Sequence, residues 1–285
     1  MTMESLSAAR ADIEGRHILS FSGGKDSTAL GVYLIQNYPD IAERLEIVFC
    51  DTGAELPETY DYIRKFETVM GVDVTFINAL DMLGIGDKRG RTPFDVILQE
   101  YYGQFLPSPQ MRWCTRILKI KPFEAYVGYD RAYSYIGIRA EENRLGYQKS
   151  GSGTSSQEQA TGATKPIAIS EKQNIIPVYP FKEDGLVLDD VKELLEDCGL
   201  GMPPYYKWRS RSGCYFCFYQ QIGEWQGLKE NHPKLFEKAK EYEKEEGGRK
   251  YTWAQGRSLD AVEKLEKRYE VPDGEDLDGC AICHL

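Results

Sequence analysis

Short apolar runs alternate with amphipathic stretches along the first half of the chain. Four runs have the length and the β-branched or large apolar content of buried strands: residues 17–21, 45–50, 73–77 and 133–138. Three stretches place their apolar residues in the pattern of a helix: residues 27–36, 55–69 and 115–127. This alternation predicts an α/β fold, a doubly wound and mostly parallel sheet with helices on its faces.

The second half of the chain has a different character. Further helices are predicted at residues 188–198, 233–246 and 258–269, and a short helix at residues 93–101 lies in a long loop. We therefore predict an α/β domain over residues 1–185 and a smaller helical, cysteine-bearing region over residues 186–285. Residues 148–165 are polar and low in complexity, so we expect a mobile loop there.

The first predicted strand runs into a glycine-rich hexapeptide that opens the first predicted helix. Glycines allow backbone N–H groups to converge on an anion, and a helix N-terminus adds partial positive charge. An ordinary glycine turn is the alternative, but the full hexapeptide after an apolar strand favours a phosphate site. The candidate phosphate-binding residues are Ser22, Gly23, Gly24, Lys25, Asp26 and Ser27.

This SGGKDS segment resembles the pyrophosphate loop (PP-loop) of the adenine-nucleotide α-hydrolase superfamily. Three further segments resemble its phosphoadenylyl-sulfate reductase-like branch: FCDTGAE at 49–55, RWCT with LKIKP at 112–122, and GIRAEENR at 137–144. The closest likeness is to the ATP pyrophosphatases of DNA phosphorothioation. The resemblance covers roughly residues 17–145 and implies ATP and Mg²⁺ at the carboxyl ends of the strands. It also implies a homodimer.

The resemblance also implies roles for single residues. Lys25 and Asp26 would act in catalysis, with Asp26 holding either the loop or a magnesium ion. Asp51 and Gly53 would position the nucleotide or the metal, although Asp51 is also placed to cap a helix. Arg139 and Arg144 would reach phosphates from the other side of the cleft, the alternative being surface or ion-paired arginines. Lys119 and Lys121 lie two residues apart, so they should not share a helix face.

Seven cysteines in a chain without a secretory signal point to metal or sulfur chemistry rather than disulfides. Cys214 and Cys217 form one C-x2-C pair, and a second pair lies in the tail. With the RWCT cysteine and one tail cysteine, the first pair completes a four-thiolate set, for which the resemblance implies a 4Fe-4S cluster. Zinc on the same thiolates, or persulfide sulfur without a metal, are the alternatives. The predicted ligands are Cys114, Cys214, Cys217 and Cys280.

The remaining tail cysteine, Cys283, is the freer thiol and the candidate nucleophile. Its neighbour His284 gives it a loose similarity to the nucleophilic tail of sulfonucleotide reductases. The alternative is a terminus whose cysteine has no function. Cys50 and Cys198 lie in an apolar run and at a helix end, so we expect them to be structural.

Charge and hydropathy limit the partners. The net charge of −10 disfavours tight independent binding of nucleic acid, so DNA would be reached through partner proteins. One basic-aromatic segment over residues 205–211 could contact nucleic acid or form a rim around the metal site. No apolar run approaches the roughly 20 residues of a membrane span, and we expect a cytoplasmic protein.

The leading functional hypothesis is an ATP pyrophosphatase that adenylates an acceptor, the DNA backbone, for sulfur insertion. A cysteine desulfurase would then supply the sulfur. The second hypothesis is a sulfonucleotide reductase in which Cys283 attacks the sulfur of phosphoadenylyl or adenylyl sulfate and sulfite is released. A third is a non-enzymatic nucleotide-sensing subunit, and a tRNA thiolation enzyme is a near relative of the first.

Overall fold

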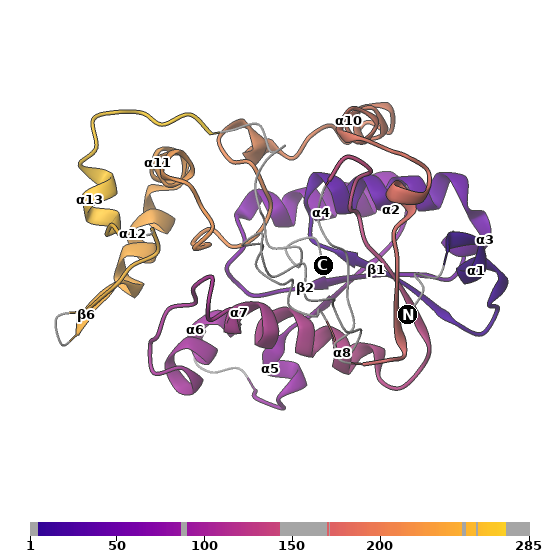
Figure 1. Cartoon of the computed structure of the whole chain (residues 1–285), viewed down its shortest axis with the longest axis horizontal. Helices are drawn as coiled ribbons and strands as arrows, with labels where there is room; N and C mark the ends of the chain where they lie inside the picture. Colours follow the sequence, from indigo (N-terminus) through magenta and orange to yellow (C-terminus); the bar gives the residue numbers. More distant parts are fainter. Residues whose placement is uncertain are drawn as a thin grey trace, which may run out of the picture.

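The central sheet has five parallel strands in the order β3-β2-β1-β4-β5 (Figure 1). The strands are β1 (Arg16–Phe21), β2 (Leu45–Cys50), β3 (Val74–Ile77), β4 (Ala132–Tyr135) and β5 (Ile175–Val178). The chain leaves β1 toward β2 and later returns on the opposite side as β4. In open parallel sheets this reversal creates a crevice at the carboxyl ends of the strands. The doubly wound α/β prediction is confirmed.

Helices cover both faces of the sheet (Figure 1). On one face lie α2 (Lys25–Asn37), α4 (Pro57–Met70) and α10 (Leu188–Asp197); on the other lie α5 (Ala79–Met82) and α8 (Lys121–Val127). The period-two pattern of β1 explains the arrangement, since Leu19 and Phe21 join the core under α2 and Ile18 joins Phe123 on the α8 side. Strands β1, β4 and β5 are thus buried on both faces, as continuous apolar runs require.

The structure describes residues 5–86, 90–142, 170, 172–246, 249–254 and 256–271. Four predictions lie outside the described residues: Arg144, Cys280, Cys283 and the loop at 148–165. The described part of the chain contains no helix with both the length and the apolar character needed to cross a bilayer.

Short helices complete the part of the chain before residue 186. They are α1 (Leu6–Ala11), α3 (Pro39–Ala42), α6 (Pro93–Val96), α7 (Trp113–Thr115) and α9 (Pro180–Glu183). Two π-helical turns, Ile97–Tyr101 and Arg116–Ile120, extend α6 and α7. Such turns often occur at functional sites because they re-aim side chains within a helix.

The C-terminal region differs from the prediction in its boundaries. It contains a 3₁₀ turn (Pro204–Lys207), α11 (Ile222–Asn231), α12 (Pro233–Tyr242), the antiparallel pair β6 (Lys244–Glu246) and β7 (Arg249–Tyr251), and α13 (Leu259–Glu263). The helix predicted at 233–246 was wrong beyond Tyr242. Glu243 leaves the helix, and its carboxylate accepts hydrogen bonds from the backbone N–H groups of Trp253 and Leu259. The helix predicted at 258–269 ends early, at Glu263.

An aromatic core connects the C-terminal region to the loops that follow the sheet. The ring centroids of Phe94 and Phe216 are 4.2 Å apart, and Trp253 stacks on Phe216 at 5.0 Å. The Trp113 ring also stacks on Phe94, at 5.3 Å. This core draws residues from both sides of the predicted boundary at 185, so the C-terminal region packs directly on segments that leave the sheet.

Candidate functional site

The glycine-rich hexapeptide connects the end of β1 to the start of α2. Gly23 has φ +67°, and a Cβ there would lie 2.9 Å from the Thr59 side chain, so both conformation and space require glycine. Gly24 is the N-cap of α2 and makes no side-chain cap bond. The backbone N–H groups of the first turn therefore need other acceptors, which makes this helix end suited to an anion.

Two buried serines fix the shape of the phosphate loop. The backbone N–H of Ser22 donates to Ser27 Oγ over 3.2 Å, and the two hydroxyl oxygens lie 3.0 Å apart. Ser27 Oγ also donates to the carbonyl of Gly24 over 3.3 Å. These hydrogen bonds within the loop hold its shape without a ligand.

A buried ion-pair network holds the charges of the loop. Asp26 Oδ1 lies 2.6 Å from Arg139 Nη1, and Asp26 Oδ2 lies 3.2 Å from Lys25 Nζ. Arg139 also pairs with Glu142, at 3.1 Å. Burial lowers the pKa of Lys25, but Tyr206 and Asp26 more than offset this and raise its pKa overall, so its ammonium stays protonated. Burial likewise lowers the pKa of Arg139, while Asp26 and Glu142 raise it overall.

The contacts of Asp26 and Arg139 can be compared with the roles that the sequence predicts for them. Asp26 makes the contacts of a loop-holding residue, and Arg139 reaches the loop through it. Gly137 allows this approach, because a Cβ there would lie 2.9 Å from the backbone oxygen of Asp26. Arg139 is therefore a buried, ion-paired residue at the N-terminus of α2.

The loop after β2 forms a second polar group. Asp51 accepts hydrogen bonds from the Gly53 N–H and the Tyr60 hydroxyl, both at 2.8 Å. Gly53 has φ +67°, and a Cβ there would lie 2.8 Å from Pro93. Sequence reasoning missed Glu55, which is buried and accepts the Thr52 hydroxyl proton at 2.8 Å. Burial raises the pKa of Glu55, whereas Lys119 opposes that rise.

A C-terminal segment forms a second wall against the phosphate loop. Tyr205 donates its hydroxyl proton to the carbonyl of Gly23 over 2.8 Å, and the Lys25 N–H donates to Tyr206 Oη over 3.4 Å. Ser212 Oγ lies 3.4 Å from Ser22 Oγ. These three residues were not predicted as loop contacts, because nothing local in their sequence shows which distant element they meet.

The same segment corrects the nucleic-acid interpretation of residues 205–211. Arg209 and Arg211 are buried, with relative exposures of 1% and 8%, and so is Trp208. Arg209 donates to the carbonyls of Gly213, at 3.0 Å, and Cys214, at 2.6 Å. An exposed binding patch is therefore wrong for Arg209 and Arg211, whereas their role as a rim around a metal site stays a prediction.

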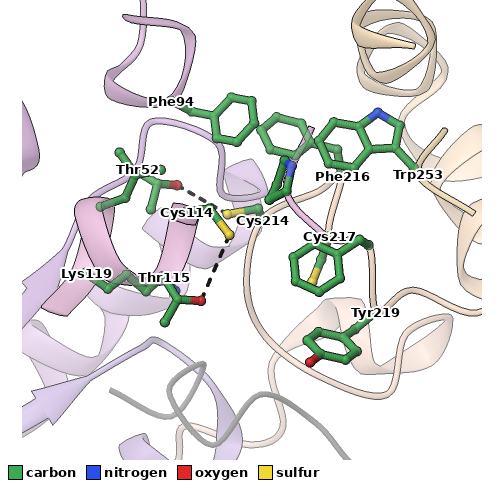
Figure 2. Close-up of a pocket in the computed structure, with 13 residues that line it drawn as sticks. Thr52, Phe94, Cys114, Thr115, Lys119, Cys214, Phe216, Cys217, Tyr219 and Trp253 are labelled. Carbon is green, nitrogen blue, oxygen red and sulfur yellow. Dashed lines mark hydrogen bonds between the residues drawn. The ribbon is translucent and has the colours of Figure 1, made fainter. Parts of the chain in front are cut away.

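The three described candidate ligands lie around one cavity (Figure 2). Cys114, Cys214 and Cys217 line it together with Lys119 and an aromatic wall that includes Phe94, Phe216 and Trp253. Figure 2 shows the Cys114 and Cys214 sulfurs turned toward the same space. The Cys214 sulfur lies 3.4 Å from the Thr52 hydroxyl, so the cavity adjoins the end of β2.

The donor set fits a thiolate-bound centre in its chemistry. Three thiols facing one apolar cavity are the donor type that zinc and iron–sulfur clusters use. Within the described ranges, no three such side chains are gathered closely enough to hold a single metal ion. Burial raises the pKa of Cys214 to about 12, and a bound cation would favour its thiolate instead.

The other candidate lysines and cysteines differ in whether they line the cavity. Lys119, on the π-helical turn, lines the cavity, whereas Lys121 is half-exposed and pairs with Glu124 at 3.2 Å. The prediction that these lysines do not share a face is confirmed. Cys50 is buried in the sheet core, and Cys198 caps the end of α10.

The comparison with protein families decides the assignment. The family model described as "Phosphoadenosine phosphosulfate reductase domain" matches residues 16–217. The chain belongs to this family. The matched span of the phosphoadenosine phosphosulfate reductase domain begins at the first residue of β1 and ends at Cys217, so it includes both the phosphate loop and the three described cavity cysteines.

Individual relatives of this domain are distant. Two uncharacterized proteins of Methanocaldococcus jannaschii are 27% and 26% identical over 226 residues, covering 77% and 78% of this chain. An uncharacterized nin region protein of Escherichia phage lambda is 27% identical over 145 residues, covering 44% of this chain and 49% of that protein. The chain spans 45% and 40% of the two archaeal relatives, less than half their length.

Two solved structures show similarity at low identity. A phosphoadenylyl-sulfate reductase from Candida auris, in a phosphate complex, has a TM-score of 0.45 and 12% identity, covering 73% of this chain and 84% of that chain. A U34-tRNA thiolase from Methanococcus maripaludis with its [4Fe-4S] cluster has a TM-score of 0.38 and 15% identity, covering 80% of this chain and 70% of that chain.

Proposed function

We propose that this protein is an ATP pyrophosphatase that cleaves ATP between the α and β phosphates and adenylates an acceptor for sulfur insertion. The acceptor we propose is the DNA backbone, reached through partner proteins, as in DNA phosphorothioation. The terminal sulfur of a cysteine persulfide, supplied by a cysteine desulfurase, then displaces AMP from the adenylated acceptor, and a thiol reduces the resulting disulfide to release the phosphorothioate.

One observation carries this proposal: a single short segment contacts the phosphate loop and also supplies two cavity cysteines. Tyr205 and Ser212 lie against the loop, and Cys214 and Cys217 follow within five residues of Ser212. A phosphate site and a thiol-lined cavity are therefore neighbours. Nucleotide activation and sulfur delivery need such proximity, because the adenylated acceptor must meet sulfur before water.

The residues of the phosphate loop have separate tasks in this reaction. The first turn of α2 and the Lys25 ammonium would bind the pyrophosphate end of ATP and stabilise the charge that develops as it leaves. Asp26 and Arg139 keep Lys25 in place through the buried network. Mg²⁺ bound with the nucleotide would neutralise further phosphate charge.

The cavity would hold the sulfur-handling centre. Cys114, Cys214 and Cys217 would bind a 4Fe-4S cluster, or zinc as the alternative, with Cys280 proposed as the fourth ligand. Such a cluster supplies a centre for sulfur or electron transfer, while Lys119 and Thr52 place a positive charge and a hydroxyl at the cavity wall. A homodimer is part of the proposal.

The family itself favours a second candidate. A phosphoadenosine phosphosulfate reductase domain covers residues 16–217, so reduction of a sulfonucleotide to sulfite is the alternative activity. In that reaction Cys283 would attack the nucleotide sulfur, and thioredoxin would release sulfite from the resulting thiosulfonate.

The two candidates are separated by offering both substrates to anaerobically purified full-length protein. One reaction contains ATP and Mg²⁺; the other contains phosphoadenylyl sulfate and thioredoxin, and a parallel series contains adenylyl sulfate. AMP formation from ATP, lost in the Lys25→Ala and Asp26→Ala variants, supports the pyrophosphatase. Sulfite formation with ATP left intact supports the reductase and overturns the proposal.

A further inference from the structure

Tyr206 makes two contacts with Lys25 at the start of α2. Its hydroxyl oxygen accepts the Lys25 backbone N–H at 3.4 Å, and its ring centroid lies 4.9 Å from Lys25 Nζ. Lys25 is the first helical residue after the Gly24 cap, so this N–H has no acceptor within the helix. The hydroxyl therefore occupies a position that suits an anion.

A phosphate oxygen would compete for the same N–H. A charged acceptor makes a stronger hydrogen bond than a neutral phenol, and the helix dipole favours negative charge at this point. The 3.4 Å separation lies beyond the usual range for N–H···O bonds, so the tyrosine contact is the weaker of the two.

The segment that carries Tyr206 continues into the cysteine cavity. The buried Arg209 donates to the carbonyls of Gly213 and Cys214, and the Tyr215 N–H donates to the carbonyl of Ala54 at 2.9 Å. The stretch between Tyr206 and the cavity wall is therefore short and hydrogen-bonded.

We propose that Tyr206 is a positioning residue that occupies a pyrophosphate position on α2 and, when the nucleotide displaces it, reports occupancy to the cysteine cavity. This inference rests on the proposed nucleotide site but not on turnover. In the free protein the hydroxyl adds to the contacts by which Tyr205 and Ser212 hold the segment on the loop. In the nucleotide complex the hydroxyl yields the N–H to a phosphate oxygen, and residues 213–219 loosen.

The test compares inorganic pyrophosphate binding to the wild-type full chain and the Tyr206→Phe variant. Phenylalanine keeps the ring over Lys25 but removes the competing oxygen. The variant should bind Mg²⁺-pyrophosphate roughly threefold to tenfold more tightly by calorimetry, the equivalent of one neutral hydrogen bond. The matched control is Tyr126→Phe on α8. It removes a hydroxyl that donates to Glu46 at 2.6 Å and should leave the pyrophosphate affinity unchanged.

Hydrogen exchange provides the second readout. Pyrophosphate should accelerate amide exchange in residues 213–219 of the wild type, whereas Tyr206→Phe should show the faster rate without ligand. Equal or weaker pyrophosphate binding by Tyr206→Phe would overturn the inference, because damage to a merely structural residue weakens binding. Unchanged or slower exchange in residues 213–219 of the wild type would overturn it as well.

Different results would contradict the role of Tyr206 and the proposed pyrophosphatase activity. Pyrophosphate binding without any AMP formation from ATP counts against the proposed function alone. AMP formation with no tightening in Tyr206→Phe counts against the inference alone. Absence of pyrophosphate binding in the wild type overturns both.

Discussion

The phosphate loop and the cysteine cavity lie at the same end of the sheet, yet they are built in opposite ways. The loop is one contiguous hexapeptide whose charges are tied into a buried network with Arg139. The cavity is assembled from segments far apart in the chain, from Thr52 through Cys114 to Trp253, and its walls are mostly apolar.

This difference indicates what each region does to charge. In the loop, a paired and protonated lysine sits at a helix N-terminus, which prepares the site for an anionic ligand. In the cavity, burial keeps the Cys214 thiol neutral until a cation or a reaction favours the thiolate. The loop is thus ready for phosphate, whereas the cavity requires a further component.

The largest expected effect comes from breaking the loop network. Arg139→Ala leaves Asp26 and Glu142 buried with less compensation, so the free energy of unfolding should fall by about 3–5 kcal/mol. Urea denaturation followed by circular dichroism measures this. The exposed Arg64, which pairs with Asp61, is the control, and Arg64→Ala should cost less than about 1 kcal/mol. Equal losses of stability in both variants would show that the buried network stabilises the fold no more than an exposed ion pair does.

Removal of the Lys25 ammonium should have the next largest effect, on chemistry rather than on stability. Lys25→Ala should lower AMP formation from ATP by roughly 10²–10³-fold, the usual loss when a transition-state charge partner is removed. The control is Lys121→Ala, whose half-exposed side chain pairs with Glu124 outside the cavity. Near wild-type turnover in Lys25→Ala would show that the Lys25 ammonium takes no part in the reaction.

A smaller effect should follow from crowding the contact between the loop and the C-terminal segment. A Cβ on Gly24 would lie 2.5 Å from Ser212 Oγ and 2.9 Å from Ser212 Cβ, so Gly24→Ala must push the two apart. Overpacking of this kind should lower the free energy of unfolding by about 1–3 kcal/mol in urea denaturation. Gly86→Ala adds the same methyl group in open space and should leave the stability unchanged. Equal stabilities of the two variants would mean that the loop and the segment do not pack against each other.

The smallest expected effect concerns Cys50, which is buried in the sheet core rather than in the cavity. Burial raises the pKa of its thiol to about 12, so native Cys50 should resist iodoacetamide at pH 8.5 while the half-buried Cys198 reacts. Because the folded-state pKa is raised, the stability that Cys50 contributes is present below about pH 8.5 and is lost as pH rises toward 12. Mass spectrometry of the labelled peptides checks this, and rapid Cys50 labelling would contradict it.

Elements with strong local signals were predictable from sequence. The bounds of β2 match residues 45–50, and the phosphate loop follows β1 directly, because both depend on neighbouring residues alone. Strand β5 was missed because its four residues include Pro177, which local rules assign to a turn or an edge. Helix α11 was missed because it contains Gly223 and Gly227; a Cβ on Gly227 would lie 2.7 Å from the Trp208 ring.

The candidate site was predictable only where its residues are adjacent in the chain or share a recognisable pattern. The three described cysteines were chosen from spacing and resemblance, and the structure brings them to one cavity. Tyr206 was not chosen, since its importance comes from a long-range contact that no local pattern encodes. Glu55 lies within the FCDTGAE segment, but its burial does not show in the sequence. For the same reason the buried Arg209 was placed among surface residues.

The central claim is that the loop breaks the bond between the α and β phosphates of ATP. The most direct measurement follows α-labelled and γ-labelled ATP in parallel with anaerobically purified protein and Mg²⁺, together with acceptor DNA. The account predicts that the α label appears in AMP and the γ label in pyrophosphate, at equal rates. Recovery of the label as ADP and orthophosphate, or of intact ATP from a protein that releases sulfite from a sulfonucleotide, would contradict it.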